Sequence, residues 1–357
     1  MMSTKLESCI SHENICVVDA MCKIQQNAKG VLYIVDESGR FLGSVTDGDL
    51  RRWVIQTGDI KGVASQFLNR EAKFIREDQM DDAKQILMER KVRSMPVVDS
   101  DGRIVDIVFD NFYSNTGKPL SVLKGASIII MAGGKGTRLY PYTKILPKPL
   151  IPIGDIPIIE RIMNRFSRYG ADHFWLIVNY KKEMIRSYFS EQNLPYQIDF
   201  VYEDELLGTA GGIRLVPEKF ENPVIITNCD ILIEAEYDDI LEHHNSNGND
   251  MTIVSSLKNI EIPYGVLDTK ENGMVIAMEE KPQIPTVINT GMYILNPDYI
   301  DWIPEKQFFH MTQLAQKMMD NGKKVGMYPI SETSFLDMGE FEELKKMERR
   351  LENVGSF

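Results

Sequence analysis

A segment near the middle of the chain combines glycine residues with basic side chains, and this combination is suited to binding a phosphorylated small molecule. An apolar run, 127–131, leads into the sequence AGGKGTRL at 132–139. Glycine allows backbone N–H groups to approach phosphate oxygens closely, and basic side chains neutralise the charge that remains. Between Ala132 and Leu150 the chain carries four basic residues and no acidic one, although its net charge is -12. We therefore expect an anionic ligand at this segment.

The glycine-rich segment departs from two common phosphate-binding motifs. The Walker A motif ends in Gly-Lys-Ser/Thr at a fixed spacing, and that ending is missing here. In the dinucleotide-binding pattern G-x-G-x-x-G, counted from Gly134, the last position is Leu139 instead of glycine. Neither a P-loop nor a dinucleotide site is therefore indicated. Taken alone, the loop is also compatible with an ordinary tight turn.

The pattern after residue 119 predicts the scaffold that positions this loop. Short apolar runs alternate with helical stretches, which is typical of an α/β domain with a mostly parallel sheet. The clearest helix is 158–166, where five apolar residues fall on one face at helical spacing. A charged segment with a Leu/Met stripe, 340–352, predicts a surface helix. The predicted strands are 127–131, 174–178, 198–202, 224–227, 251–255, 291–295 and 325–329.

Three segments that could do chemistry each follow one of these strands. They are 132–138, 203–212 and 228–230. Ligands of parallel α/β sheets bind at the carboxyl ends of the strands. We therefore expect the three segments to border one pocket.

Length and composition set limits on the kind of protein. At 357 residues the chain is long for one domain, and 43% hydrophobic with 26% charged residues excludes a disordered chain. No apolar run approaches the roughly 20 residues that a membrane helix needs. The four cysteines form no C-x-x-C pair, and the first residues lack the apolar core of a signal peptide. We expect a cytoplasmic protein with no membrane partner, and the acidic net charge argues against a nucleic-acid partner.

The first third of the chain contains an internal repeat. The segments 30–45 and 93–108 align with a constant offset of 63 residues, which pairs Val35 with Val98 and Gly39 with Gly102. Each unit is predicted to contain a helix, a strand, a D-x-x-G-R turn and a second strand. Two such units can bury one shared core, which one unit alone could not.

These two units resemble a tandem pair of cystathionine-β-synthase (CBS) domains, the Bateman module. In that family a Thr or Ser followed three positions later by Asp contacts the ribose of an adenine nucleotide, which implies Thr46 and Asp49 as ligands here. The second repeat has Phe109 and Phe112 at the matching positions, so at most one ordinary adenine-nucleotide site is expected. The alternative is that the pair serves packing or dimerisation, and a homo-oligomer formed through CBS pairing is expected.

The glycine-rich loop and its continuation, AGGKGTRL followed by PKPLIPI, resemble the signature of the sugar-1-phosphate nucleotidyltransferases. The resemblance implies a Rossmann-like, mostly parallel nucleotidyltransferase domain over 119–357, preceded by a tandem CBS module over 1–118 with repeats of about 1–62 and 63–118. It also implies that the loop surrounds the triphosphate of a nucleoside triphosphate. By the same resemblance Arg138 and Lys148 neutralise that triphosphate.

The resemblance also suggests which base is read. Glu203 stands where uridylyl- and thymidylyltransferases often have Gln. A carboxylate only accepts hydrogen bonds, so it suits the two adjacent donors of guanine better than the single donor of uracil or thymine. GTP is therefore favoured, while a solvated loop acid is the alternative for Glu203. The implied nucleotide-binding residues are Ala132, Gly133, Gly134, Gly136, Thr137, Glu203, Gly208, Thr209 and Ala210.

Metal and sugar ligands follow from the same resemblance. Asp230 and Asp337 are the implied Mg²⁺ ligands, because two carboxylates with phosphate oxygens and water meet the octahedral demand of that ion. Lys281 is implied to bind the sugar phosphate. The five histidines, among them His243 and His244, show no metal-ligand spacing and are expected at the surface. The implied sugar-binding residues are Gly265, Glu280, Asn289 and Thr290.

The combination of a tandem CBS module with this transferase domain resembles bacterial guanylyltransferases of surface-sugar biosynthesis and implies a sugar-1-phosphate guanylyltransferase. It would transfer GMP from GTP to a hexose or hexosamine 1-phosphate, with glucosamine 1-phosphate favoured, and release pyrophosphate. No general base is required, because a phosphate monoester is already nucleophilic at neutral pH. One alternative is a uridylyl- or thymidylyltransferase acting on glucose 1-phosphate. A more distant alternative is a non-catalytic, nucleotide-sensing regulatory subunit.

Overall fold

A computed structural model describes residues 7–27, 29–90, 92, 94–109, 121–339, 344–345 and 347. The chain divides into two units by its internal contacts. Unit 1 consists of Met1–Lys118, Ser256–Ile288 and Pro329–Thr333. Unit 2 consists of Pro119–Ser255, Asn289–Tyr328 and Ser334–Phe357. The division adds two later segments to the predicted N-terminal module. The predicted C-terminal helix 340–352 lies almost entirely outside the described residues.

The two repeats of unit 1 have the predicted order of elements, each with a three-stranded sheet. The first contains β1 (Ile10–His12), α2 (Val17–Asn27), β2 (Val31–Val35), β3 (Phe41–Thr46) and α3 (Asp47–Thr57). The second contains β4 (Ile75–Arg76), α4 (Ala83–Arg90), β5 (Ser94–Val98) and β6 (Ile104–Phe109).

The two repeats bury one shared core, as the sequence predicted. A single cluster of buried residues joins β2 of the first repeat to β5 and β6 of the second. The hydroxyl groups of Tyr33 and Ser94 are hydrogen-bonded at 2.7 Å. An isolated β-bridge joins Arg40 to Arg103, which is the same position in each repeat at the offset of 63 residues. The repeats therefore meet symmetrically, each covering the open face of the other.

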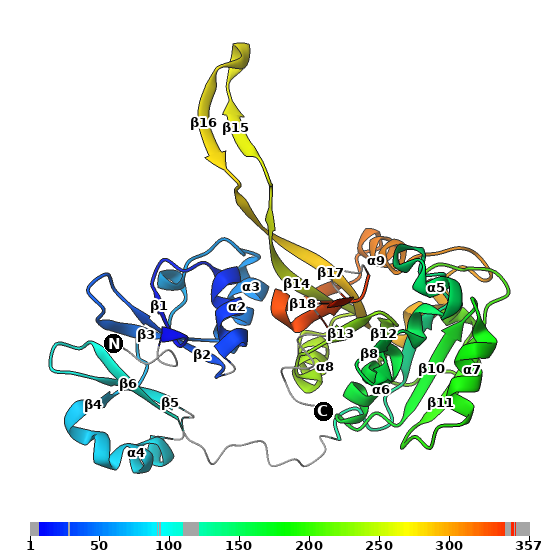
Figure 1. Ribbon diagram of the computed structural model, residues 1–357, viewed down its shortest axis with the longest axis horizontal. Coiled ribbons are helices and arrows are strands. Elements are labelled where there is room, and N and C mark those ends of the chain that lie inside the picture. The colour runs from blue at the N-terminus through cyan, green and yellow to red at the C-terminus, as the bar shows by residue number, and fades with distance from the viewer. Residues whose placement is uncertain are drawn as a thin grey trace. The chain divides into compact units, whose positions relative to one another are not determined.

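Unit 1 also contains a two-stranded ribbon from the second half of the chain. The ribbon consists of β15 (Gly265–Thr269) and β16 (Val275–Glu280), which pair antiparallel and run side by side in yellow in Figure 1. Its supporting strands, β14 (Met251–Glu261) and β17 (Gln283–Leu295), extend well beyond the predicted 251–255 and 291–295. Within unit 1, Asn259 of β14 donates a hydrogen bond of 2.9 Å to Asp19 of α2.

Unit 2 is built on a seven-stranded sheet in the order β11-β10-β7-β12-β17-β14-β18. The strands β11, β10, β7 and β12 are parallel, and β17 is antiparallel to β12. This confirms the prediction of an α/β fold with a mostly parallel central sheet. The bounds are β7 Ile128–Ala132, β10 His173–Val178, β11 Gln197–Tyr202, β12 Val224–Asn228 and β18 Val325–Ser331.

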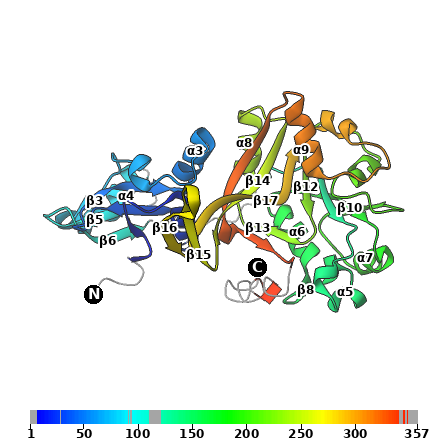
Figure 2. The same ribbon diagram turned by 90° about the horizontal axis from the view of Figure 1, so that it is seen from above.

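Helices cover both faces of this sheet. Alternate residues of β7 point to opposite faces. Ile129 and Met131 share a buried cluster with Leu314 of α9 (Met311–Asp320). On the other face, Phe166 of α6 (Ile158–Ser167) packs edge-on against Phe174. Figure 2 shows α6 and α9 beside the strands. The other helices and short strands are α5 Tyr142–Ile145, α7 Lys182–Ser190, α8 Tyr237–Ser246, β8 Pro152–Ile153, β9 Ile156–Pro157, β13 Ile231–Ile233 and β19 Phe335–Asp337.

The strand order creates a crevice between β7 and β12. From β7 the chain moves outward to β10 and β11, and it later returns to the opposite side of β7 to form β12. Ligands of open α/β sheets bind at such a reversal of direction, at the carboxyl ends of the strands. The glycine-rich loop follows β7, and Asn228–Asp230 follows β12, so both predicted segments reach the crevice.

The structure bears on two expectations from the sequence, one about membrane-spanning segments and one about the exposure of the histidines. Among the described residues, no helix combines the length and the apolar character that crossing a membrane requires. The expectation that the histidines lie at the surface is wrong for His244, which is buried and hydrogen-bonded to Thr252 and Asn296 at 2.9 and 3.0 Å. Two polar partners satisfy the ring nitrogens and make this burial tolerable.

Candidate active site

A cavity of about 350 Å³ lies where β7 and β12 end. Its walls come from the glycine-rich loop, from the segment after β11, from the end of β12 and from the D-x-G motif near the C-terminus. The three segments that the sequence predicted to share a pocket do border this one. The lining residues are Met131, Gly133, Gly134, Gly136, Thr137, Arg138, Lys148, Glu203, Leu206, Gly208, Thr209, Asn228, Cys229, Asp230, Phe308 and Gly339.

The glycine-rich loop is folded tightly onto Lys148. Gly136 has a φ of +63°, and a Cβ at this position would lie 3.0 Å from side-chain atoms of both Lys148 and Thr143. The hydroxyl of Thr143 donates a hydrogen bond of 2.8 Å to the Gly136 carbonyl, which fixes the turn. Gly134 has no other atom within 4 Å of the Cβ position, so its face is open. The loop therefore needs glycine for close packing at one position and offers open backbone at another.

Lys148 and Asp230, which both line the cavity, form an ion pair. Both side chains are largely shielded from solvent, with exposed fractions of 9% and 15%. Pro147 and Pro149 flank the lysine and restrict its backbone. A shielded ion pair with this geometry holds the ammonium group at one point. The predicted triphosphate-binding lysine and the predicted metal ligand are thus in direct contact.

Asp337 is the second carboxylate at this place. The strands β13 and β19 pair antiparallel, and the N–H of Met338 donates a hydrogen bond of 2.8 Å to the Asp230 carbonyl. Burial raises the pKa of Asp337, and the like charge of Asp230 adds to this effect. The positive charges of Lys148 and Arg138 act in the opposite direction. The two acids, 107 residues apart in sequence, are therefore close enough to repel each other.

The two acids suit Mg²⁺. That ion is commonly held by one or two carboxylates, with substrate phosphates and water completing the octahedron. In the described part of the chain no cluster of three or more His, Cys, Asp or Glu side chains is placed to hold a metal ion. A cation whose remaining ligands come from the substrate is consistent with this arrangement, and it would relieve the repulsion between Asp230 and Asp337.

Glu203 is buried in the wall of the cavity, so the alternative of a solvated loop acid is wrong. Only 3% of the residue is exposed. A Cβ on Gly133 would lie 2.6 Å from one carboxylate oxygen, and a Cβ on Gly212 would lie 2.5 Å from the other. Burial raises the pKa of Glu203 to about 7, against the effect of a hydrogen bond from the Leu207 N–H. The two glycines thus make room for a carboxyl group that is poorly solvated.

Several predicted ligands of the nucleotide have structural roles. Ala132 and Ala210 are buried in the core and do not line the cavity. Gly208, at a φ of +81°, lies so close to Phe309 that a Cβ would be 2.6 Å from the Phe309 carbonyl oxygen. The Thr209 hydroxyl accepts a hydrogen bond of 3.1 Å from the Met311 N–H at the start of α9. The small residues Gly208 and Thr209 therefore allow the segment 203–212 to pack closely against the chain at Phe309 and Met311.

Two of the predicted sugar ligands bond within unit 2. The hydroxyl of Thr290 is buried and donates a hydrogen bond of 2.7 Å to the Val254 carbonyl. The side chain of Asn289 donates a bond of 2.7 Å to the Tyr293 hydroxyl and accepts one from the Gly291 N–H. Neither residue lines the cavity. For Thr290 this is a correction, because its hydroxyl serves the strand pairing and is not presented to a ligand.

The other predicted sugar-side residues gather at one end of the ribbon in unit 1. Gly265 and Glu280 face each other across β15 and β16, and a Cβ on the glycine would lie 2.9 Å from the glutamate carboxylate. Lys281 follows directly, with a φ of +50°, and its N–H donates to the Tyr264 carbonyl at 3.3 Å. All three residues are exposed. None of them lines the cavity of unit 2.

The cavity also has lining residues that sequence reasoning did not select as ligands. Phe308 is 61% exposed and comes from a connection for which the sequence gives no functional signal. Gly339 also lines the cavity and belongs to the D-x-G motif, of which the sequence analysis selected only Asp337 as a ligand. A Cβ on it would lie 3.0 Å from the Asp337 carboxylate and 3.3 Å from the Arg138 guanidinium. The pattern D-x-G could therefore have suggested that the glycine makes room for both charged groups.

The residues proposed for adenine-nucleotide binding in unit 1 form a helix cap. Thr46 is the N-cap of α3, its hydroxyl donates a bond of 2.6 Å to Asp49, and the two residues form a capping box. Arg52 pairs with the same carboxylate. The spacing of Thr46 and Asp49 thus has a sufficient explanation in helix capping. A larger cavity of about 740 Å³ belongs to the second repeat and is lined by Phe74, Arg76, Glu77, Asp78, Val98, Asp99, Ser100 and Gly102.

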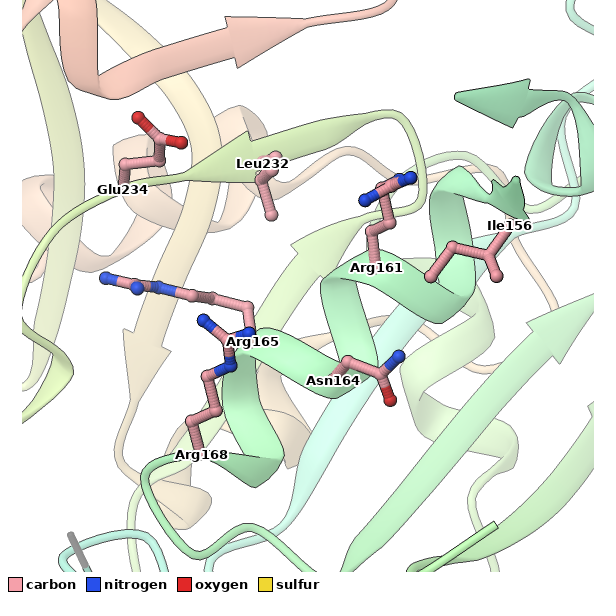
Figure 3. Close-up of a pocket in the computed structure, with 7 residues that line it drawn as sticks. All are labelled: Ile156, Arg161, Asn164, Arg165, Arg168, Leu232 and Glu234. Carbon is pink, nitrogen blue, oxygen red and sulfur yellow. The ribbon is translucent and has the colours of Figure 1, made fainter. Parts of the chain in front are cut away.

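A further cavity of unit 2, of about 290 Å³, lies between α6 and the region of β13 (Figure 3). Arg161, Arg165 and Arg168 of the α6 region line it. Arg161 is bonded to Asp155 at 3.0 Å and to the Ile153 carbonyl at 2.7 Å. Arg165 donates a bond of 2.9 Å to the Ala235 carbonyl. Protein groups therefore already hold two of these guanidinium groups.

Comparison with known proteins identifies the family. Residues 127–354 match the nucleotidyl transferase family, so the chain belongs to that family. Residues 13–56 and 65–110 match the CBS domain. Both matches confirm the resemblances that the sequence motifs indicated.

The alignments with individual relatives cover only part of each relative's length. A UTP–glucose-1-phosphate uridylyltransferase from a Synechocystis species is 33% identical over 214 residues, which are 54% of this chain and 55% of that protein. A mannose-1-phosphate guanylyltransferase from Mycobacterium tuberculosis is 34% identical over 181 residues, 50% of each chain. The chain thus spans about half the length of these curated relatives. The crystal structure of HddC from Yersinia pseudotuberculosis has a TM-score of 0.50 at 26% identity, covering 63% of this chain and 99% of that one.

Proposed function

We propose that the chain transfers a nucleotidyl group, with GMP favoured, from a nucleoside triphosphate to a sugar 1-phosphate and releases pyrophosphate. One observation carries the proposal. A glycine-rich loop and the Lys148–Asp230 ion pair border one cavity at the strand reversal of an α/β sheet, and a second carboxylate, Asp337, interacts with Asp230. The presence of these charged groups argues against the alternative of a non-catalytic regulatory subunit.

The proposed reaction joins two anions. A phosphate oxygen of the sugar 1-phosphate attacks the α-phosphorus of the triphosphate, and the bond from that phosphorus to the pyrophosphate oxygen breaks. The phosphate monoester needs no general base, so the protein contributes positioning and charge neutralisation. Lys148 and Arg138 supply positive charge next to the glycine loop. Asp230 and Asp337 would hold Mg²⁺, which when bound neutralises triphosphate charge.

The preference for GTP rests on Glu203. A carboxylate has two acceptor oxygens, and guanine presents two adjacent N–H donors on one edge. Glu203 lines the cavity together with Gly133, which supports such a contact. The guanylyltransferase from Mycobacterium tuberculosis agrees with this preference. The uridylyltransferase from Synechocystis keeps UTP as the second candidate.

The sugar side is proposed from the ribbon of unit 1. We assign Lys281 to the sugar phosphate and Glu280 to ring hydroxyl groups, with glucosamine 1-phosphate as the favoured sugar. Both side chains are exposed and therefore available to a ligand. For the CBS repeats we propose packing and pairing of two chains as the main role, because capping accounts for Thr46 and Asp49. Sensing of an adenine nucleotide is the alternative.

A pyrophosphate-release panel tests the function. Four nucleoside triphosphates are crossed with glucosamine, N-acetylglucosamine, mannose and glucose 1-phosphates in the presence of Mg²⁺. We expect the highest kcat/KM with GTP and glucosamine 1-phosphate. Repeating the best pair with AMP or ATP added tests the CBS alternative. Absence of pyrophosphate release from every pair would overturn the proposal.

A further inference from the structure

We propose that the exposed ring of Phe308 is the surface on which the base of the nucleoside triphosphate stacks. This inference rests on the proposed function, because it assumes that the cavity of about 350 Å³ holds that substrate. It deepens the function by assigning the base to one part of the cavity wall, through a residue that no sequence motif marks.

Phe308 lines the cavity with a large apolar side chain that is left in contact with solvent. Its exposed fraction is 61%. Leu206, at 39%, is the other such side chain among the lining residues that the structure describes, whereas Met131 and Cys229 are buried. Contact between water and an exposed aromatic ring is unfavourable, so a flat ligand that covers the ring is stabilised. This part of the wall therefore favours a ring system over a phosphate group.

The backbone next to Phe308 is held against the segment that follows β11. The N–H of Phe309 donates a hydrogen bond of 2.9 Å to the Leu207 carbonyl. The carbonyl of Phe309 accepts bonds of 2.9 and 3.2 Å from the N–H groups of Ala210 and Gly211. Because three hydrogen bonds fix the neighbouring residue, the point from which the Phe308 ring projects is set before any ligand binds, and little ordering is needed on binding.

The ring of Phe308 is itself restrained by His310. The two rings meet edge-on, with their centroids 4.7 Å apart and an angle of 80° between their planes. The N–H of Thr209 donates a hydrogen bond of 3.4 Å to Nδ1 of His310, and the Thr209 hydroxyl lies 3.2 Å from the same nitrogen. One edge-on neighbour orients an aromatic ring, and the exposed fraction shows that much of the ring surface stays open. Thr209 thus acts through the histidine that supports this ring.

Other segments supply the charged groups that a triphosphate needs. Arg138 follows the glycine-rich loop, and Lys148 is paired with Asp230. The phosphates and the base of one nucleotide require different surroundings, because phosphates need neutralising charge while a base needs a flat apolar contact. The cavity contains both kinds of surface, and Phe308 belongs to the apolar one. Glu203, proposed to read the edge of the base, lies on the segment to which the backbone next to Phe308 is bonded.

A ligand without a base separates stacking from phosphate binding. Inorganic triphosphate with Mg²⁺ competes with GTP through its phosphate groups alone. Phe308→Ala should raise the KM for GTP about tenfold, which corresponds to the loss of one base–aromatic contact, and leave the inhibition constant of inorganic triphosphate unchanged. Phe308→Tyr keeps the aromatic ring and should keep the KM of the unchanged chain. An unchanged KM for GTP in Phe308→Ala would overturn the inference.

A tryptophan at the same position reports the contact directly, because guanine quenches the fluorescence of an indole ring on which it stacks. In Phe308→Trp, GTP with Mg²⁺ should lower the emission of the added tryptophan, and inorganic triphosphate should leave it unchanged. The unchanged chain supplies the background from its three native tryptophans. Met319→Trp, at an exposed position of α9 that does not line the cavity, is the matched control and should show no quenching.

The outcomes separate this contact from the function on which it rests. If Phe308→Trp binds GTP in calorimetry without quenching, the base lies elsewhere, and the inference fails while the proposed function stands. If Phe308→Ala loses affinity for GTP and for inorganic triphosphate equally, the substitution disturbs the whole cavity, and a contact with the base is likewise contradicted. Absence of pyrophosphate release by the unchanged chain with every nucleoside triphosphate would overturn the proposed function itself.

Discussion

The residues assigned to the nucleotide and those assigned to the sugar are held by the protein in different ways. Lys148 and Glu203 are buried, and each is closely packed against glycine residues of unit 2. Gly265, Glu280 and Lys281 are exposed on a two-stranded ribbon that groups with the CBS repeats in unit 1. The nucleotide side is therefore arranged before any ligand binds, whereas the sugar side depends on a ribbon with little packing of its own.

This difference has a consequence for mutagenesis. A substitution on the nucleotide side disturbs tightly packed neighbours, so activity and stability should change together. A substitution on the ribbon removes only a contact with the ligand, so a binding constant should change while stability does not.

The largest effect is expected from Lys148→Ala. The substitution removes a positive charge that faces the glycine loop and leaves Asp230 without its partner. We expect kcat for pyrophosphate release to fall by about 100-fold or more. Lys124→Ala, which removes an exposed lysine elsewhere in unit 2, is the matched control and should retain normal turnover. Near-normal turnover of Lys148→Ala would remove this residue from the proposed mechanism.

Gly212→Ala should reduce both activity and stability. The added Cβ would lie 2.5 Å from a Glu203 oxygen and 2.6 Å from the Ile177 side chain. Such overpacking costs about 1–3 kcal/mol, and displacement of Glu203 should lower kcat/KM for GTP about tenfold or more. Thermal unfolding and pyrophosphate release measure the two effects. Gly134→Ala, whose methyl group meets no atom within 4 Å, should unfold at an unchanged temperature. Equal melting temperatures for all three chains would contradict the packing argument.

Glu280→Gln should affect only the sugar substrate. The side chain is exposed on β16, so its removal costs no folding free energy. We expect the KM for the sugar 1-phosphate to rise about tenfold, in line with one lost charge-assisted hydrogen bond, while the KM for GTP and the melting temperature stay constant. Lys270→Ala, an exposed residue of the same ribbon region, is the control. An unchanged sugar KM would remove Glu280 from the sugar site.

Thr290→Val should have the smallest effect and the opposite pattern. The hydroxyl is buried and donates to the Val254 carbonyl. Loss of that bond should lower the free energy of unfolding by about 1 kcal/mol and leave the sugar KM unchanged. Urea unfolding and sugar titration measure the two quantities. A raised sugar KM without loss of stability would restore Thr290 as a sugar ligand.

The sequence predicted the parts of the fold that rest on local pattern. Continuous apolar runs such as 128–131 mark strands buried on both faces, and the predicted bounds of these strands differ little from the observed ones. The outer halves of β14 and β17 escaped prediction because they are only partly buried and lack the continuous apolar run that marks the inner halves.

The site was predictable where a motif places the residue next to a strand end. Glu203 and Asp230 met this condition, Lys148 was marked by its two flanking prolines, and all three residues line one cavity. The burial of His244 depends on Asn296, a partner 52 residues away, and the exposed Phe308 reaches the cavity only through the course of the chain. Neither feature leaves a local signal, because long-range packing decides both.

The most direct test of the account is equilibrium binding of GTP with Mg²⁺, measured by calorimetry on the unchanged chain, on Lys148→Ala and on Lys124→Ala. If the cavity between β7 and β12 holds the triphosphate, Lys148→Ala should bind GTP at least about tenfold more weakly than the other two chains. Equal affinity of all three chains would show that the triphosphate binds elsewhere.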